Sequence, residues 1–211
     1  MTLTMRSRVL LTIAALLLAA TYLLPLWSVT LQAPQYPEGL GMRIWLNTIA
    51  GVKPNDLDNI NNLNHYIGMK RIIPESIPEL RLMPIGVGVL VALGLVAAGL
   101  GRRALARLWV GVYLAAAVAG LADFYRWEYD YGHNLDTENA IIKVPGMNYQ
   151  PPLIGSRQLL NFTASSFPAA GGWAAIVALG LGVMVVLSDR RPRGSALRVE
   201  AASPRAVSLV A

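Results

Sequence analysis

Four long apolar windows constrain this chain more than any other feature of its sequence. They cover residues 9–27, 84–101, 108–123 and 169–187, and each is close to the roughly 17 to 25 residues that a helix needs to cross a bilayer. Only 14% of the 211 residues are charged, against about 25% in a typical soluble domain. The sequence therefore predicts a single membrane domain over 1–211, folded as an all-α, four-helix transmembrane bundle.

The arginines predict how this bundle is oriented. Ten basic residues flank the windows on one side of a four-span topology: Arg6, Arg8, Arg102, Arg103, Arg107, Arg190, Arg191, Arg193, Arg198 and Arg205. By the positive-inside rule that side is the cytoplasm. We therefore expect a bacterial inner-membrane protein with both termini cytoplasmic and a basic cytoplasmic tail at 188–211. The net charge of +6 is then a topology signal and does not indicate a nucleic-acid partner.

Two long segments, 28–83 and 124–168, are predicted to lie outside the cytoplasm and to pack on each other as a small cap. In the first, prolines and glycines at 32–41 argue against a regular element, and the spacing of apolar residues at 40–49 predicts a short helix. That helix would lie on the membrane or against the second segment. Trp27, Trp109, Trp127 and Trp173 lie at or near window ends, where indoles favour the membrane interface.

The polar run at 55–69, N-D-L-D-N-I-N-N-L-N-H-Y-I-G-M, predicts an amphipathic helix with a packing side and a chemical side. At helical spacing, Leu57, Ile60, Leu63 and Ile67 share one face, while Asp58, Asn62, His65 and Met69 share the opposite one. His65 and Met69 are four residues apart, and an imidazole and a thioether both suit a soft metal such as Cu(I). The alternative is a surface histidine beside a methionine that fills an interface.

The second outer segment contains the only other histidine, His133, and also Met147. If the two segments meet, His65, Met69, His133 and Met147 can form a composite copper site that binds the metal transiently. The chain has no cysteine, which excludes disulfides, iron–sulfur clusters and thiolate copper centres. None of the apolar windows contains a histidine, which argues against a haem b carrier, and no catalytic motif is present, so we expect no enzyme.

Four motifs together resemble a group of small bacterial membrane proteins encoded near nitrous-oxide reductase and copper-handling genes. They are L-Q-A-P-Q-Y-P-E-G-L-G-M, N-D-L-D-N-I-N-N-L-N-H-Y-I-G-M-K, D-F-Y-R-W-E-Y-D-Y-G-H-N-L-D and K-V-P-G-M-N-Y-Q-P-P-L-I-G. The resemblance covers residues 31–167. It implies an accessory role in maturing, or supplying copper to, a periplasmic copper enzyme, and it does not identify ligands.

Two functions follow as expectations. The first is an accessory membrane protein that binds copper, or docks a copper donor, beside a periplasmic reductase such as nitrous-oxide reductase. The second is a structural or anchoring subunit of a respiratory membrane complex, whose outer segments hold a cytochrome or reductase and bind no metal. In both, the partners are membrane lipid and a periplasmic protein.

Overall fold

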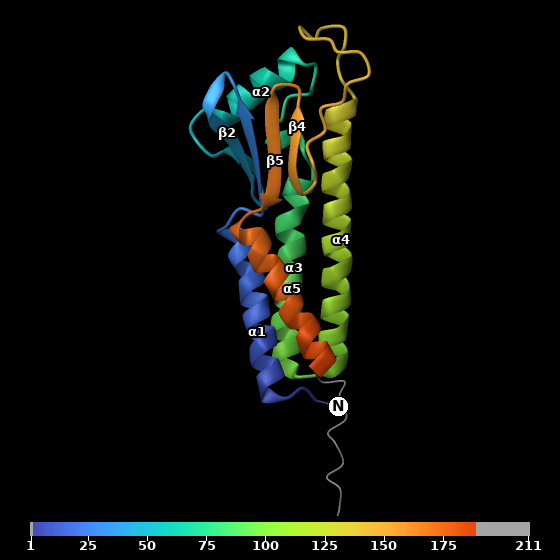
Figure 1. Ribbon diagram of the computed structural model, residues 1–211. Coiled ribbons are helices and arrows are strands. Elements are labelled where there is room, and N and C mark those ends of the chain that lie inside the picture. The colour runs from blue at the N-terminus through green and yellow to red at the C-terminus, as the bar shows by residue number, and fades with distance from the viewer. Residues whose placement is uncertain (1, 189–211) are drawn as a thin grey trace, which may run out of the picture.

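The computed structural model describes residues 2–188, and the predicted basic tail, from residue 189 onward, lies outside the described residues. Four helices are long and apolar enough to cross a membrane: α1 (Met5–Ala19), α3 (Glu79–Leu100), α4 (Arg103–His133) and α5 (Ala170–Ser188). They stand side by side along the length of the molecule (Figure 1). The four apolar windows thus correspond to four helices, as expected for a multi-pass membrane protein.

The prediction of an all-α protein is wrong, because a five-stranded antiparallel sheet stands on one end of the helices (Figure 1). Its strands are β1 (Trp27–Ala33), β2 (Tyr36–Ile44), β3 (Ile49–Gly51), β4 (Gly155–Leu159) and β5 (Phe162–Pro168). Their order in the sheet is β3-β2-β1-β5-β4. The central pair, β1 with β5, joins the two outer segments, from Trp27 opposite Pro168 to Gln32 opposite Thr163. We call residues 27–78 and 124–168 the cap.

The cap also contains α2 (Asp56–Tyr66) and a short 3-10 turn at Pro74–Ser76. A second 3-10 turn, Ala20–Tyr22, extends α1. The helix predicted at 40–49 is absent from the described chain, because that stretch forms the end of β2, a turn and the start of β3. The proline-rich stretch at 32–41 is also regular, since β1 and β2 form a hairpin there. Pro37 is accommodated because the short β3 pairs only with 42–44, which leaves the rest of β2 an edge strand.

Helix α4 is longer than the predicted span and continues ten residues past its expected end at Asp123. Its 31 residues measure about 46 Å at 1.5 Å per residue, whereas the hydrocarbon core is about 30 Å thick. The last part of α4, residues 124–133, therefore extends beside the sheet and belongs to the cap (Figure 1). In the second outer segment, 124–168, residues 134–154 form neither helix nor strand.

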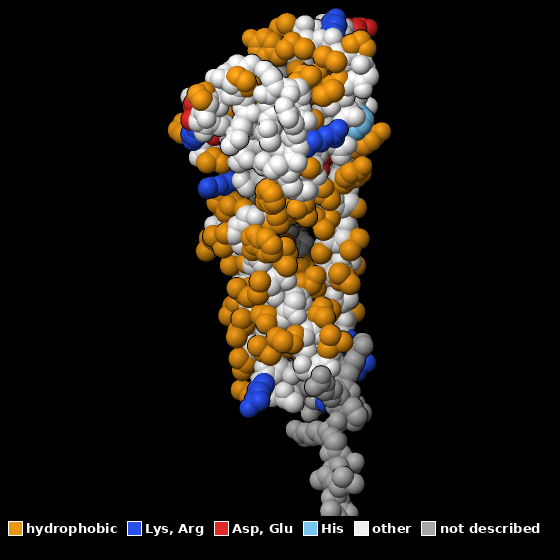
Figure 2. Space-filling model, in the orientation of Figure 1, with side chains coloured by type: hydrophobic (Ala, Val, Ile, Leu, Met, Phe, Trp, Pro, Cys, Tyr) orange, Lys and Arg blue, Asp and Glu red, His pale blue; other side chains and the backbone are white. Residues whose placement is uncertain are grey.

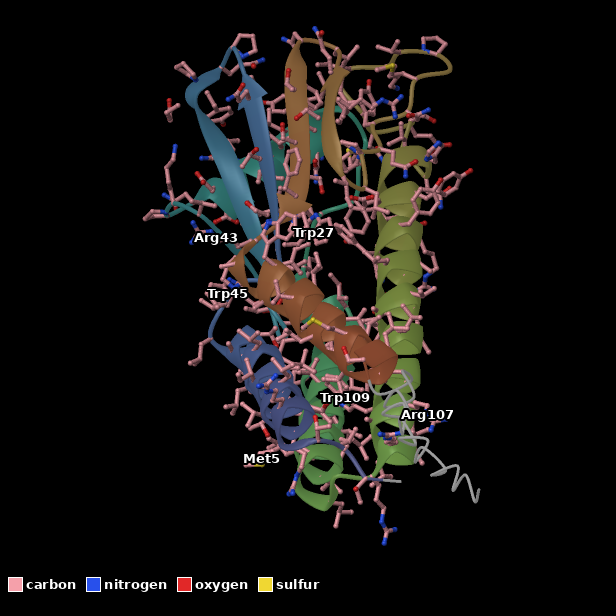
Figure 3. All side chains as sticks on the ribbon, turned by 60° about the horizontal axis from the view of Figure 1, so that its bottom comes forward. Met5, Trp27, Arg43, Trp45, Arg107 and Trp109 are labelled. Atoms are coloured by element: carbon pink, nitrogen blue, oxygen red, sulfur yellow. The ribbon has the colours of Figure 1, made fainter. Side chains whose placement is uncertain are left out.

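The core of the helical bundle is organised by Trp109, which is 1% exposed and does not lie at an interface as its position in the sequence predicted. Its indole Nε1 donates a hydrogen bond of 2.7 Å to the carbonyl of Leu90 on α3. Two glycines make room for the ring: a Cβ added to Gly94 would lie 2.9 Å from Nε1, and one added to Gly182 would lie 2.5 Å from the ring. Trp109 thus lies among α3, α4 and α5 (Figure 3).

The surface divides along the long axis of the molecule. On the face seen in Figure 2, hydrophobic side chains cover most of the helical part, and Lys and Arg side chains appear at its lower end and on the cap. Many of the exposed apolar side chains belong to the four long helices, among them Leu82, Ile85, Val118 and Ile176. Such a surface is stable in hydrocarbon and unfavourable in water.

The glycine notch around Trp109 can be tested with two neighbouring glycines of α5. We expect Gly182→Ala to lower the free energy of unfolding by roughly 1 to 3 kcal/mol, because the added methyl overpacks the ring. Gly180→Ala, which has no atom within 4 Å of the added Cβ, should be neutral or slightly stabilising. Thermal unfolding of both purified variants in detergent measures the difference. Equal effects would show that Trp109 does not need the notch.

Candidate functional site

Helix α2 exists where the polar run predicted it, and it packs on β2 and β3. A carboxylate fixes its start: Asp56 Oδ2 accepts hydrogen bonds from the N–H groups of Gly41 and Lys53, at 3.0 and 3.1 Å. Of the two residues that the sequence allowed as the cap, Asn55 or Asp56, Asn55 occupies the N-cap position in the left-handed region with φ 68° and makes no side-chain capping bond.

The buried face of α2 is partly polar, which the prediction of separate packing and chemical sides missed. Ile60 and Ile67 are buried as expected, whereas Leu57 and Leu63 are only half-buried. Asn61 is also buried, and its amide pairs with the backbone of Ile72, donating to the carbonyl at 3.1 Å and accepting from the N–H at 2.7 Å. Asn61, and Asn64 through the Lys70 carbonyl, thus supply hydrogen bonds to the backbone of the irregular chain after α2, which pairs with no helix or strand.

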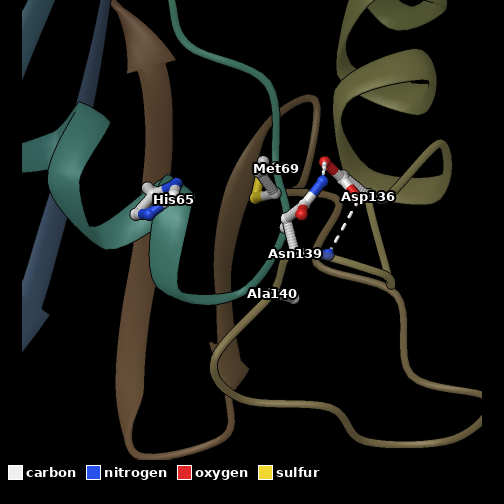
Figure 4. A pocket seen from close by; sticks show the side chains of 6 residues that line it. His65, Met69, Asp136, Asn139 and Ala140 are labelled. Carbon is white, nitrogen blue, oxygen red and sulfur yellow. Dashed lines mark hydrogen bonds between the residues drawn. The ribbon is translucent and has the colours of Figure 1, made fainter.

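The end of α2 meets the second outer segment through two backbone hydrogen bonds. The N–H of Asp136 donates to the Gly68 carbonyl, and the N–H of Ile142 donates to the Tyr66 carbonyl, each at 2.8 Å. An open pocket lies at this contact and is lined by six residues: His65, Gly68, Met69, Asp136, Asn139 and Ala140. In Figure 4, Met69 appears between His65 on one side and Asn139 with Asp136 on the other.

Asp136 supplies the negative charge of this pocket. Its carboxylate accepts a hydrogen bond of 2.8 Å from the side chain of Asn139, and further bonds from the N–H groups of Glu138 and Asn139. These donors, the Asn139 side chain first, hold the pKa of Asp136 below its usual range. Asp136 is therefore ionised at neutral pH. With His65 and Met69, it gives the pocket an imidazole, a thioether and a carboxylate, which are all groups that can bind copper.

Two of the four predicted metal ligands share this pocket and two do not line it. His133, in the last turn of α4, stacks on Tyr129 with ring centroids 4.0 Å apart, and its Nδ1 lies 3.1 Å from the Tyr129 carbonyl oxygen. Met147 is in the irregular segment, where its N–H donates to the Val144 carbonyl. Within residues 2–188, no group of three or more His, Cys, Asp or Glu side chains is arranged to hold a metal.

Sequence reasoning missed Asp136 and Asn139, and the local spacing offers a signal in retrospect. An aspartate that accepts from the backbone two and three residues later forms an Asx-type turn, which is typical of D-T-E-N. That turn alone does not indicate a pocket. The pocket exists because Gly68 and Asp136, which are far apart in the chain, lie against each other.

The second outer segment is held to the first by further contacts around α4. Lys70 Nζ forms an ion pair of 2.7 Å with Asp130, and the Tyr131 hydroxyl donates to the Arg71 carbonyl at 3.2 Å. The ion pair is exposed and contributes little free energy. Its value is positional, because it aligns the chain just after Met69 with the last turns of α4.

Comparisons with known proteins do not place the chain in a family. No protein-family model matches it, and a search of curated proteins finds no match.

The contact that forms the pocket can be tested with two glycines in the left-handed region, Gly68 at φ 77° and Gly146 at φ 74°. Alanine at either position costs roughly 1 to 2 kcal/mol in backbone strain. At Gly68 the added Cβ would also lie 2.6 Å from the Asp136 carbonyl oxygen, whereas Gly146 has nothing within 4 Å. We therefore expect Gly68→Ala to be the more destabilising by roughly 1 to 3 kcal/mol.

Hydrogen exchange locates this effect. The amides of Asp136 and Ile142 should exchange faster in Gly68→Ala and remain protected in Gly146→Ala. Unchanged protection in both variants would mean that the two outer segments hold together without this contact.

Proposed function

We propose that this protein is a membrane-embedded accessory protein whose cap binds a partner protein outside the cytoplasm. The orientation rests on the arginines, because Arg6, Arg8, Arg102, Arg103 and Arg107 all lie at the end of the bundle opposite the cap, as the positive-inside rule requires for an outward-facing cap. A partner on that side is a periplasmic protein, such as a reductase or a cytochrome. The bacterial inner membrane is the location that this proposal implies.

A run of exposed apolar side chains in the segment 134–154 carries the proposal. Ile141 is 65% exposed, and Ile142 and Val144 are exposed as well. They belong to the loop after α4, which lies at the end of the molecule away from the four helices (Figure 1), and Figure 2 shows hydrophobic side chains at that end. This end cannot face the bilayer that surrounds the four helices. Contiguous apolar side chains exposed to water typically mark a surface that another protein covers.

The apolar side chains are held in place, which favours binding without a large ordering cost. The N–H of Ile142 is bonded to the Tyr66 carbonyl, and the N–H of Ala140 is bonded to the Asp136 carbonyl. Lys143 Nζ donates to the Glu138 carbonyl at 2.9 Å, so the one cation among these residues is turned back onto the loop. The exposed face of 141–144 is therefore mainly apolar.

Site-specific photo-crosslinking in cells tests this docking surface. A photoreactive residue at Ile141 or Val144 should give one dominant adduct with a single periplasmic protein. The same residue at Ile73, which is 47% exposed elsewhere in the cap, serves as the matched control and should not give it. The double variant Ile141→Ser/Ile142→Ser should lower the membrane-associated fraction of that protein by roughly tenfold or more, if two anchors of about 1 to 2 kcal/mol each are lost. Equal adducts at all three positions would contradict the proposal.

Copper handling is the second candidate function, and the pocket of His65, Met69 and Asp136 favours it. The resemblance to proteins encoded near nitrous-oxide reductase gives this pocket a biological context, a periplasmic copper enzyme. An open site with three mixed ligands suits transient binding and transfer more than permanent storage. In this case the docking surface adjoins the pocket, because Ala140 lines the pocket and Ile141 is the next residue in the chain.

Bound metal in protein purified from copper-supplemented membranes separates the two candidates. We expect His65→Ala and Met69→Ala to lower copper occupancy, whereas His133→Ala and Met147→Ala leave it unchanged, because only the first pair lines the pocket. Protein abundance in the membrane should stay normal in His65→Ala, since this exposed side chain contributes little to folding. Loss of copper in all four variants would restore the composite site predicted from sequence. If the wild-type protein contains no copper, docking remains as the single candidate function.

A further inference from the structure

The sheet of the cap has one edge that the chain itself covers. On the β2 side, the N–H of Gly41 donates to the Asp56 carboxylate, and the Gly41 carbonyl accepts from the N–H of Val52. Lys53 Nζ donates to two further carbonyls of β2, at 3.2 and 2.8 Å. The short strand β3 pairs with residues 42–44. Side chains and a third strand therefore take up the hydrogen-bonding groups along this edge.

The opposite edge of the sheet is β4, which has no such cover. Within residues 2–188, β5 is the only helix or strand against which β4 packs to any extent, and β4 is the last strand in the sheet (Figure 1). Three successive side chains, Ser156, Arg157 and Gln158, are exposed. Successive side chains of a strand point to opposite faces, so β4 is accessible from both faces at these residues. It is an open edge strand.

The hairpin that joins β4 to β5 shows which backbone groups face this open edge. Its loop is two residues long, with Leu159 opposite Phe162. The residues that close such a turn are hydrogen-bonded to each other, and bonded pairs then alternate along an antiparallel ladder. The N–H and C=O groups of Arg157 therefore point toward β5. Those of Ser156 and Gln158 point away from it, to the open edge.

These four outward backbone groups are free to bind another chain. The N–H and C=O groups of Ser156 and Gln158 form no hydrogen bond with any other residue that the structure describes. Buried backbone groups are almost always paired, so unpaired ones of this kind face solvent. Lying two residues apart along a strand, they present two donor and acceptor pairs about 7 Å apart, which is the repeat of an antiparallel ladder.

A second copy of this chain does not supply the missing strand. Two copies in one membrane share the same orientation, so a two-fold axis between them runs along the membrane normal. Because β4 runs roughly along the long axis of the molecule (Figure 1), the two β4 strands would be parallel and level, residue for residue. In a parallel pair, only one of two level residues directs its backbone groups at its neighbour. Ser156 opposite its own copy forms no ladder.

We propose that the open edge of β4 binds an extended segment of another protein, which joins the sheet as an additional antiparallel strand. In this mode of recognition, main-chain hydrogen bonds give affinity and alternate side chains give specificity. Arg157 provides the specificity, because it is exposed and its guanidinium makes only a hydrogen bond of 3.4 Å to the Gln150 carbonyl within the described chain. The added strand is therefore expected to place an Asp or Glu opposite Arg157.

This strand site lies next to the segment 134–154, since β4 begins directly after it. It rests on the proposed function only for the outward orientation of the cap. It requires neither the apolar side chains at 141–144 nor copper in the pocket, because backbone groups and Arg157 make the contact. Each of the three can therefore fail while the others hold.

Amide hydrogen exchange of the purified full-length protein in detergent tests whether the edge is open. The N–H groups of Arg157 and Leu159 should be protected by β5, whereas those of Ser156 and Gln158 should exchange at least about tenfold faster. This alternation requires no partner and no variant. Equal exchange at the four amides would mean that the edge is already covered or that β4 is not paired as described, and either would overturn the proposal.

Photo-crosslinking in cells tests the added strand. A photoreactive residue at Gln158 should give one dominant protein adduct, and the same residue at Thr30, exposed on the same face of the central strand β1, should not. Ser156→Pro removes an outward N–H without breaking the ladder to β5, and should lower the Gln158 adduct at least about tenfold. Ser156→Ala should leave it unchanged.

The outcomes separate strand addition from docking at 141–144. Absence of an adduct at Gln158, or an equal adduct at Thr30, would overturn the strand site, whereas the adduct at Ile141 reports on the docking surface alone. A Gln158 adduct that is undiminished in Ser156→Pro would show contact through side chains only and would likewise contradict strand addition.

The charge of the partner strand is tested by reversing Arg157. Arg157→Glu should lower the Gln158 adduct roughly tenfold, because it places like charges opposite each other. Arg71→Glu makes the same change at an exposed arginine elsewhere in the cap and should leave the adduct unchanged. Equal effects of the two reversals would contradict an acidic residue opposite Arg157.

Discussion

The antiparallel pairing of β1 with β5 is the interaction on which the rest of this structure depends. β1 follows α1 and β5 leads into α5, so the pair continues two packed helices out of the bundle. The junction is tight: the N–H of Ala169 donates to the Leu26 carbonyl, and a Cβ added to Gly172 would lie 2.3 Å from that same oxygen. The sheet is therefore set on the bundle by backbone contacts that no larger residue permits.

Helix α4 is the second support of the cap and connects features that lie far apart in the chain. Below the cap it fixes the bundle through Trp109, and above it contacts both outer segments on different faces. Asp130 and Tyr131 hold the chain after α2, while Phe124 and Gly132 hold β1 and the segment before β4. The turns of α4 beyond Asp123 thus provide a surface on which two otherwise separate segments pack. A helix that ended at the membrane surface would leave the outer segments to pack without it.

The candidate sites follow this arrangement. The pocket of His65, Met69 and Asp136 lies where the end of α2 meets the chain after α4. The segment 134–154 lines this pocket through Asp136, Asn139 and Ala140 and also exposes the apolar side chains of the proposed docking surface. A partner protein that binds this segment would therefore lie next to the pocket.

The sequence by itself determined the membrane-spanning architecture, because crossing hydrocarbon requires long apolar helices and leaves a compositional record that local reading detects. It also determined α2, whose period is helical, and the basic side chains at one end. The strands were not recognisable in this way. β1 alternates Val29, Leu31 and Ala33 inward with Thr30 and Gln32 outward, but the run is short and directly follows an apolar window, and β2 contains Pro37, Gly39 and Gly41.

Only the tertiary structure decided that 27–33 and 162–168 pair, because a sheet draws its hydrogen bonds from segments that no local pattern relates. The candidate sites show the same limit. The i, i+4 spacing of His65 and Met69 was visible in the sequence. Asp136 lines the same pocket only because its backbone is hydrogen-bonded to Gly68. His133 does not line the pocket and stacks on Tyr129. The local sequence does not reveal that Glu128 is buried, since it belongs with Asp130 to one charged, aromatic run. Its neighbours on the same face of α4 are covered by segments distant in the chain, Phe124 by Trp27 and Gly132 by the backbone of Gln150.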